Sequence, residues 1–281
     1  MDSEAPTGIR ADVCEPDARP AIEAFLTLFG TDRPSLEQIW AAMDFVWDAL
    51  GCDNRKPTDE MFARFYGHPV WLLNGLFIEQ HPLSLQHRRA FAEWVAARQP
   101  ARVADFGGGY GTLARMIGER CPRTEVHIVD PYPRPEARRA CATFRNVGLV
   151  EELDGRYDVV IATDVFEHVP DALGLLYDVV RHVEPGGRLL AANHFGPSMK
   201  CHLPRTFHFA DTWPFFTALA GCRFDGNVSY GQAFTKVADT SLSGRARRWE
   251  RVSQATYRAI GRNRRLRRLR RRGFGALRRL V

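Results

Sequence analysis

Four glycines lie within five positions of the stretch "FGGGYG", directly after a short apolar run. Asp105 precedes the turn, and Gly107, Gly109 and Gly111 alternate through it. Because glycine lacks a Cβ and adopts positive φ freely, such a turn lets a ligand approach the backbone closely. A nicotinamide-binding turn, G-x-G-x-x-G, would need a third glycine where Thr112 stands. A carboxylate at the head of the turn disfavours a phosphate and favours a cationic ligand.

Two further stretches place acidic or imidazole groups at the ends of apolar runs. Asp130 ends "EVHIVD", roughly twenty residues beyond the glycines, where a carboxylate can accept both hydroxyls of a ribose. An aspartate at a strand end can also simply cap a turn. The stretch "YDVVIATDVFEHVPD", residues 157–171, carries Asp164 and His168 after its apolar run. We expect Asp105, Asp130 and Asp164 to lie at the carboxyl ends of neighbouring strands, where ligands bind in open α/β sheets.

Strands and helices alternate along the part of the chain that must position these groups. Apolar strands are expected at residues 102–106, 125–130, 157–164 and 187–195, with a weaker one at 146–150. Helices of ten to thirteen residues follow most of them, and residues 225–239 predict a closing hairpin. This alternation predicts an α/β fold: an open, doubly wound, mostly parallel sheet with an antiparallel edge.

The chain divides by composition into four parts. Residues 1–20 are polar and contain proline, which predicts a flexible arm. Residues 21–100 carry apolar side chains at three- and four-residue spacings and predict an N-terminal helical cap, whose loops could also close over a ligand. Residues 101–240 form the sheet domain, and residues 241–281 are an Arg-rich basic C-terminal tail.

Composition narrows the class of protein. Residues 245–281 hold fifteen arginines and one glutamate, so the chain's net charge of +6 comes from this segment and the rest of the chain is acidic. An acidic body makes nucleic acid an unlikely partner. The six cysteines are scattered without a C-x-x-C pair, which indicates reduced thiols. The polar, acidic start is not a secretory signal, and no apolar run approaches the length needed to span a bilayer. We therefore expect a cytoplasmic protein.

The stretches "VADFGGGYGTLA", "VHIVDPYP" and "YDVVIATDVFEHVPDALGLLYDVVRHVEPGGRLL" resemble, in order and spacing, the motifs of class I S-adenosylmethionine-dependent methyltransferases. The resemblance covers roughly residues 100–238 and implies S-adenosylmethionine as the cofactor. It implies that the glycine turn and Asp105 hold the methionine end, Asp130 the ribose, and the loop at residues 150–153 the adenine, with Glu151 or Glu152 as a candidate contact. The cofactor-binding residues implied by the motifs, together with two from a predicted lid at residues 65–81, are Asp105, Gly107, Gly109, Gly111, Asp130, Pro131, Asp164, Val165, Tyr66 and Asn74.

Methyl transfer to a hydroxyl needs alignment and a base, and histidine is the usual base near neutral pH. Three histidines are candidates: His194 at the end of the last predicted parallel strand, His208 just before the next helix, and His168 in the acidic motif. Together with Cys201, the spacings of His194, His202 and His208 fit no tight ligand pattern, so no metal site is expected.

We expect O-methylation of a small or glycan-linked acceptor, as in polysaccharide biosynthesis. The alternatives are a lipid, quinone or secondary metabolite, then RNA, and a non-catalytic scaffold. For the tail, residues 262–281, three interpretations compete: binding to an anionic membrane surface, a simply solvated chain, and binding to nucleic acid or an acidic partner. Binding to lipid would place the protein at the inner face of the membrane. The sequence leaves the oligomeric state open.

Overall fold

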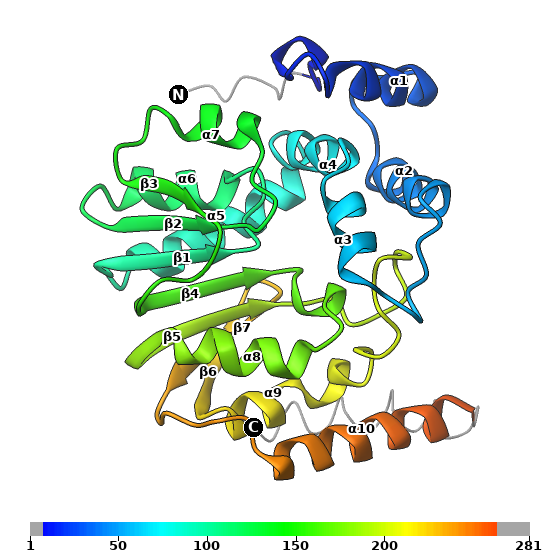
Figure 1. Ribbon diagram of the computed structural model, residues 1–281. Helices are drawn as coiled ribbons and strands as arrows, with labels where there is room; N and C mark the ends of the chain where they lie inside the picture. Colours follow the sequence, from blue (N-terminus) through cyan, green and yellow to red (C-terminus); the bar gives the residue numbers. More distant parts are fainter. Residues whose placement is uncertain (1–7, 263–281) are drawn as a thin grey trace.

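The computed structural model describes residues 8–262 and contains one seven-stranded sheet in the order β3-β2-β1-β4-β5-β7-β6 (Figure 1). β1 to β5 run parallel, and β7 pairs antiparallel with both β5 and β6. This confirms the predicted parallel sheet with its antiparallel edge. The strands are β1 Arg102–Phe106, β2 Glu125–Val129, β3 Val147–Val150, β4 Tyr157–Thr163, β5 Val183–Ala192, β6 Cys222–Val228 and β7 Gly231–Lys236.

Helices cover both faces of the sheet because successive strand residues point to opposite sides. On β4, Val159 and Ile161 pack in one apolar cluster with α5 and α6, whereas Val160 and Ala162 pack in another with α8 and α9. Burial on both faces explains why the central strands are continuously apolar. The helices of this domain are α6 Thr112–Arg120, α7 Pro135–Cys141, the short 3-10 helix η2 Phe166–His168, α8 Ala172–Arg181 and α9 Phe209–Leu219.

The N-terminal segment forms helices as predicted. The first four, α1 to α4, gather beside the loops that follow the central strands, whereas α5 packs on the sheet beside α6 (Figure 1). Ser35 caps α2 in a reciprocal capping box with Gln38, and the stripe on α2 buries Met43 and Trp47. α4 packs directly on the glycine turn, because a Cβ added to Gly75 would lie 2.7 Å from Cβ of Tyr110. These elements are η1 Ala11–Val13, α1 Arg19–Phe29, α2 Leu36–Ala49, α3 Asp59–Tyr66, α4 Val70–Ile78 and α5 Pro82–Ala96.

The segment that composition predicts to be a flexible arm is packed, and the basic C-terminal segment begins with a helix. In the expected arm, Ile9 and Cys14 are buried in the same apolar cluster as α1 to α4. In the expected tail, residues up to 262 form a helix, α10 (Gly244–Arg262), which lies along α9 (Figure 1). Ala246 of α10 is buried, and Arg247 pairs with Asp171 at 2.5 Å. Residues 263–281, most of the stretch predicted to meet a membrane, lie outside the described residues.

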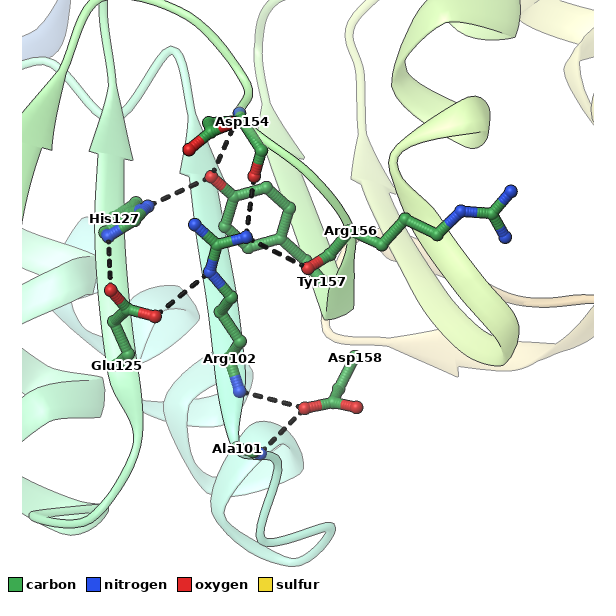
Figure 2. A network of polar contacts seen from close by, with 8 residues as sticks. All are labelled: Ala101, Arg102, Glu125, His127, Asp154, Arg156, Tyr157 and Asp158. Atoms are coloured by element: carbon green, nitrogen blue, oxygen red, sulfur yellow. Dashed lines mark hydrogen bonds and ion pairs between the residues drawn. The ribbon is translucent and has the colours of Figure 1, made fainter.

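A polar network ties the amino ends of β1, β2 and β4 together, at the edge opposite to the glycine turn (Figure 2). Arg102 donates to Glu125 at 3.0 Å, Glu125 contacts His127 at 3.0 Å, and His127 contacts the Tyr157 hydroxyl at 3.0 Å. Asp158 accepts two backbone N–H groups, at 2.7 and 2.8 Å, from the residues that begin β1. These bonds support the strand register that aligns the turns at the carboxyl ends. No helix in the described part of the chain is both long and apolar enough to cross a bilayer.

Candidate functional site

A cavity of about 710 Å³ lies where the carboxyl ends of β1, β2, β4 and β5 meet the N-terminal helices. Its volume is in the upper half of the range for small-molecule sites, which leaves room for two ligands at once. The predicted site residues that line this cavity are Asp105, Gly107, Gly109, Asp130, Pro131, Asp164, Val165, His168, His194, Tyr66 and Asn74. Gly111, His208, Glu151 and Glu152 do not line it.

The glycines of the turn serve two different purposes. All three have positive φ, +72° at Gly107, +53° at Gly109 and +81° at Gly111. A Cβ on Gly109 would meet nothing within 4 Å, so this glycine faces the open cavity. A Cβ on Gly107 would lie 2.5 Å from Val165, and one on Gly111 would lie 2.6 Å from Ile128. Gly109 is therefore the close-approach position, while Gly111 is required by packing against β2 and not by a ligand.

Asp105, the residue before the last of β1, carries a buried carboxylate. Its side chain is 1% exposed, and neither carboxylate oxygen has a hydrogen-bond partner among the described residues. Burial raises the pKa of Asp105 from 3.8 to about 6, because the charged form is poorly solvated there. Buried polar groups in folded proteins are nearly always satisfied, so an orphaned carboxylate on a cavity wall indicates a missing donor ligand. A cationic ligand with N–H groups fits this position.

Asp130 follows β2 and is held by the turn that it begins. Its Oδ1 accepts the backbone N–H of Tyr132 at 2.8 Å, and burial raises its pKa. The Tyr132 ring stacks on Tyr66 of α3, with centroids 6.0 Å apart and planes 14° apart. The cap thus reaches across the cavity to the turn after β2, as expected for a lid. This arrangement places a carboxylate and two aromatic faces where a nucleoside would fit.

Asp164 follows β4 in a strained conformation, with φ of +54° at a residue other than glycine. The Tyr230 hydroxyl, from the turn between β6 and β7, donates to its Oδ2 at 3.0 Å. Desolvation raises the pKa of Asp164, while Arg88 of α5, also on the cavity wall, acts to lower it. Asp164 is thus held at the cavity wall by a contact from the distant β6–β7 hairpin.

His194 lies two residues after β5 and lines the cavity. Its backbone N–H donates to Oε1 of Glu167 at 2.6 Å, so a buried carboxyl group fixes the loop that carries the histidine. Glu167 is fully buried, and its Oε2 has no partner among the described residues. Burial and the nearby Asp164 raise the pKa of Glu167 to about 8. Glu167 is therefore protonated at neutral pH, and its carboxyl group positions the backbone that carries His194.

The other two candidate bases are differently placed. His168 lines the cavity, but burial and the neighbouring His202 lower its pKa to about 3, which makes it a weak base. His208 points away from the cavity: its Nδ1 contacts the Ser253 hydroxyl of α10 at 2.9 Å, and burial lowers its pKa to about 4. The prediction for His208 is corrected by the structure, because the helix that it precedes turns this side chain toward α10.

Several cavity residues carry no sequence signal of their own. Arg88 sits on a helix with many charged residues, Tyr132 follows Asp130 by two positions, and Tyr230 occupies a hairpin turn. Only Tyr132 could have been found, from its distance to Asp130 along the chain. The other two reach the site through tertiary packing.

Comparisons with known proteins agree with this geometry. A family model described as "Methyltransferase domain" matches residues 77–236. A trans-aconitate 2-methyltransferase of Deinococcus radiodurans is 28% identical over 36% of this chain and 42% of its own length. A demethylmenaquinone methyltransferase of Thermus thermophilus is 32% identical over 38% of this chain and 53% of its own length. The chain thus spans about half the length of these curated relatives.

A solved structure extends the likeness to the whole fold. The structure of an O-methyltransferase family protein from Burkholderia thailandensis has a TM-score of 0.51, at 15% identity, over 84% of this chain and 90% of that one. At this identity the likeness concerns the fold alone. The family match is independent of it and includes the glycine turn, Asp130 and Asp164. Since that match covers more than half of the sequence, the chain belongs to the methyltransferase domain family.

Proposed function

We propose that this chain transfers a methyl group from S-adenosylmethionine to an oxygen atom of a small acceptor. The observation that carries the proposal is Asp105, a buried and unpaired carboxylate beside the open Gly109 on the wall of a cavity large enough for two ligands. The ammonium group at the methionine end of the cofactor would supply the charge and the N–H donors that Asp105 lacks. Asp130 would accept the ribose hydroxyls.

When bound, the cofactor supplies a methyl group that is already activated as a sulfonium. The chain's contribution is then alignment, exclusion of water and removal of the acceptor proton. The cap helices enclose the cavity, with Tyr66 and Trp71 on its wall. His194, held by Glu167, is the base that the geometry favours, because His168 has too low a pKa and His208 lies off the cavity wall.

The cap side of the cavity favours a planar, largely apolar acceptor. The Tyr66 hydroxyl and the Trp71 indole N–H are buried without a partner among the described residues, so they are available to an acceptor's oxygen atoms. Aromatic walls with few fixed polar groups are typical of sites for flat hydrophobic ligands. This observation favours a quinone or aromatic secondary metabolite over a glycan-linked acceptor, and one relative's name, demethylmenaquinone methyltransferase, agrees with it. The aromatic residues on this wall are Trp40, Phe62, Tyr66, Trp71 and Phe77.

Calorimetry with S-adenosylmethionine and with its demethylated product tests the cofactor. We expect both to bind, and we expect Asp105→Asn to weaken binding while Asp178→Asn, an exposed carboxylate on α8, does not. Absence of binding to either compound would favour the non-catalytic scaffold. Labelled methyl transfer to hydroxylated quinones and phenols, set against sugar and lipid-linked glycan acceptors, then identifies the acceptor class. Labelling of glycans alone would overturn the preference for an aromatic acceptor.

We also propose that α10 meets an anionic lipid surface. Arg248 and Arg251 are exposed there beside Trp249 and Val252, which are 43% and 46% exposed. Each cation near such a surface contributes about 1 kcal/mol, and an exposed tryptophan suits the interface. The wild-type protein should sediment with phosphatidylserine vesicles at low salt. The double variant Arg248→Glu, Arg251→Glu should stay in the supernatant, whereas Arg89→Glu on α5 should sediment like wild type. Equal sedimentation of all three proteins would contradict the proposal.

A further inference from the structure

Two histidines and a cysteine gather at one end of the cavity, and one of them, His168, is outside the set whose spacing predicts no metal site. One ligand atom from each of His168, Cys201 and His202 lies within 4.8 Å of the other two. His168 belongs to η2 after β4, while Cys201 and His202 belong to the loop between β5 and α9. All three side chains are buried, so the cluster is not a chance meeting of mobile surface groups.

The two imidazole rings are held as metal-binding rings usually are. Nδ1 of His168 lies 3.3 Å from the backbone carbonyl of Cys201, and Nδ1 of His202 lies 2.8 Å from that of Gly196. Metal-binding histidines usually donate one ring N–H to a carbonyl, which fixes the tautomer and leaves the other nitrogen for the ion. The two rings are nearly perpendicular, at 88°, with centroids 4.7 Å apart.

We propose that His168, Cys201 and His202 bind one zinc-type divalent ion. A thiolate and two imidazoles form the mixed sulfur and nitrogen set that zinc prefers over magnesium or calcium. In a tetrahedral zinc site, ligand atoms lie roughly 3.5 Å apart, so the cluster has to contract by about 1 Å, which side-chain rotation can supply. Ligation requires the thiolate, so the Cys201 proton leaves to solvent as the ion arrives.

The position of the ion gives it an open side. His168 and His202 line the cavity, whereas Cys201 lies behind them. Three protein ligands with a fourth position open to a cavity are the pattern of catalytic zinc sites, and structural sites instead close all four. Resting on the proposed function, we infer that an acceptor hydroxyl takes this position and loses its proton more readily there. His194, whose ring centroid is 5.9 Å from that of His202, can accept the proton.

Cobalt and zinc titrations of the full-length protein, without cofactor or acceptor, test the site directly. With Co²⁺, wild-type protein should show a thiolate-to-cobalt charge-transfer band that saturates at one ion per chain. Cys201→Ser should abolish the band and weaken Zn²⁺ binding by more than about 100-fold, beyond the usual effect of an outer-shell change. Cys222→Ser, a matched buried cysteine on β6, should leave both unchanged. Absence of the band from folded wild-type protein, or its persistence in Cys201→Ser, would overturn the proposal.

Turnover then separates the ion's role from methyl transfer itself. Removing the ion from wild-type protein with a chelator should lower turnover while calorimetry still detects cofactor binding, and adding Zn²⁺ should restore turnover. If Zn²⁺ binds but its removal leaves turnover unchanged, the ion does not hold the acceptor and that part of the inference is wrong. If no methyl transfer occurs with or without Zn²⁺, the proposed function fails, and the titrations still decide the ion site.

Discussion

Asp105 is expected to weaken the fold in the absence of ligand and to strengthen it when the cofactor is bound. Asp105→Asn keeps the size and shape of the side chain but removes its charge. In the free protein the charge is buried without a hydrogen bond to the described residues, and Arg88 offsets only part of the cost of burial, so its removal should stabilise the fold. In the complex the same charge meets the cofactor, so its removal should weaken binding. One substitution is therefore expected to change stability and affinity in opposite directions.

The magnitude follows from the pKa of Asp105. An increase from 3.8 to about 6 corresponds to about 3 kcal/mol less stability when the group is charged. Because the folded pKa lies above the unfolded one, the folded state holds its proton longer. The cost is absent below pH 4, grows as the pH rises toward 6, and is complete above about pH 7. Loss of a charge-assisted hydrogen bond costs about 1.5–3 kcal/mol of cofactor binding, or roughly 10- to 150-fold in Kd.

Thermal unfolding and calorimetry at pH 5 and pH 8 provide the assay. At pH 8 the free variant should melt several degrees above wild type, and at pH 5 this gap should shrink. Wild-type affinity for the cofactor should rise between these pH values, while that of the variant should rise less. If Asp105→Asn lowered the melting temperature at pH 8, or bound the cofactor as tightly as wild type, the assignment of Asp105 to the cationic end of the ligand would be refuted.

Five further substitutions, in three experiments, test the site. Gly111→Ala should cost about 2 kcal/mol or more in urea unfolding, since its Cβ collides with β2, whereas Gly109→Ala should mainly weaken cofactor binding in calorimetry. Glu167→Gln should remove the loss of thermal stability that wild type shows as the pH rises toward about 8, because the folded pKa of Glu167 is raised; an unchanged pH profile would contradict this. His194→Gln should lower turnover about 100-fold and His208→Gln should not; equal turnover in both would exclude His194 as the base.

Most of the sheet could be predicted because its strands carry a local signal. Continuous apolar runs such as Val159 to Ala162 identify strands that are buried on both faces, and each ends at a polar residue that marks the site edge. Asp105, Asp130 and Asp164 were therefore predicted to share an edge, and all three line the cavity. At these three positions the residue type and its immediate neighbours in the sequence determine where the side chain lies, so the sequence alone can predict it.

The rest of the site depends on how side chains orient once segments that are distant in the sequence have packed together. His208 precedes a helix over the correct edge, yet its ring meets Ser253, 45 residues later in α10. The Arg-rich composition of α10 does not indicate which of its residues contact the domain, whereas in the structure the buried Ala246 and the ion pair of Arg247 hold it there. His168 and Cys201 are 33 residues apart and meet only through the loop after β5.

The buried acids also make the site sensitive to the charge of its ligand. The pKa values of Asp105 and Glu167 are raised to about 6 and about 8, and that of Asp164 is raised as well, each mainly by burial. The cavity wall and the buried Glu167, next to the cavity residue His168 in the chain, therefore gain negative charge as the pH increases from 6 to 8.5. The sulfonium of the methyl donor is cationic, whereas the thioether of the demethylated product is neutral, so increasing pH should favour the donor over the product. We expect the ratio of their affinities, measured by calorimetry, to rise at least several-fold over this range in wild type and to rise less in Glu167→Gln. A constant wild-type ratio would show that the charges of Asp164 and Glu167 do not act on the sulfonium.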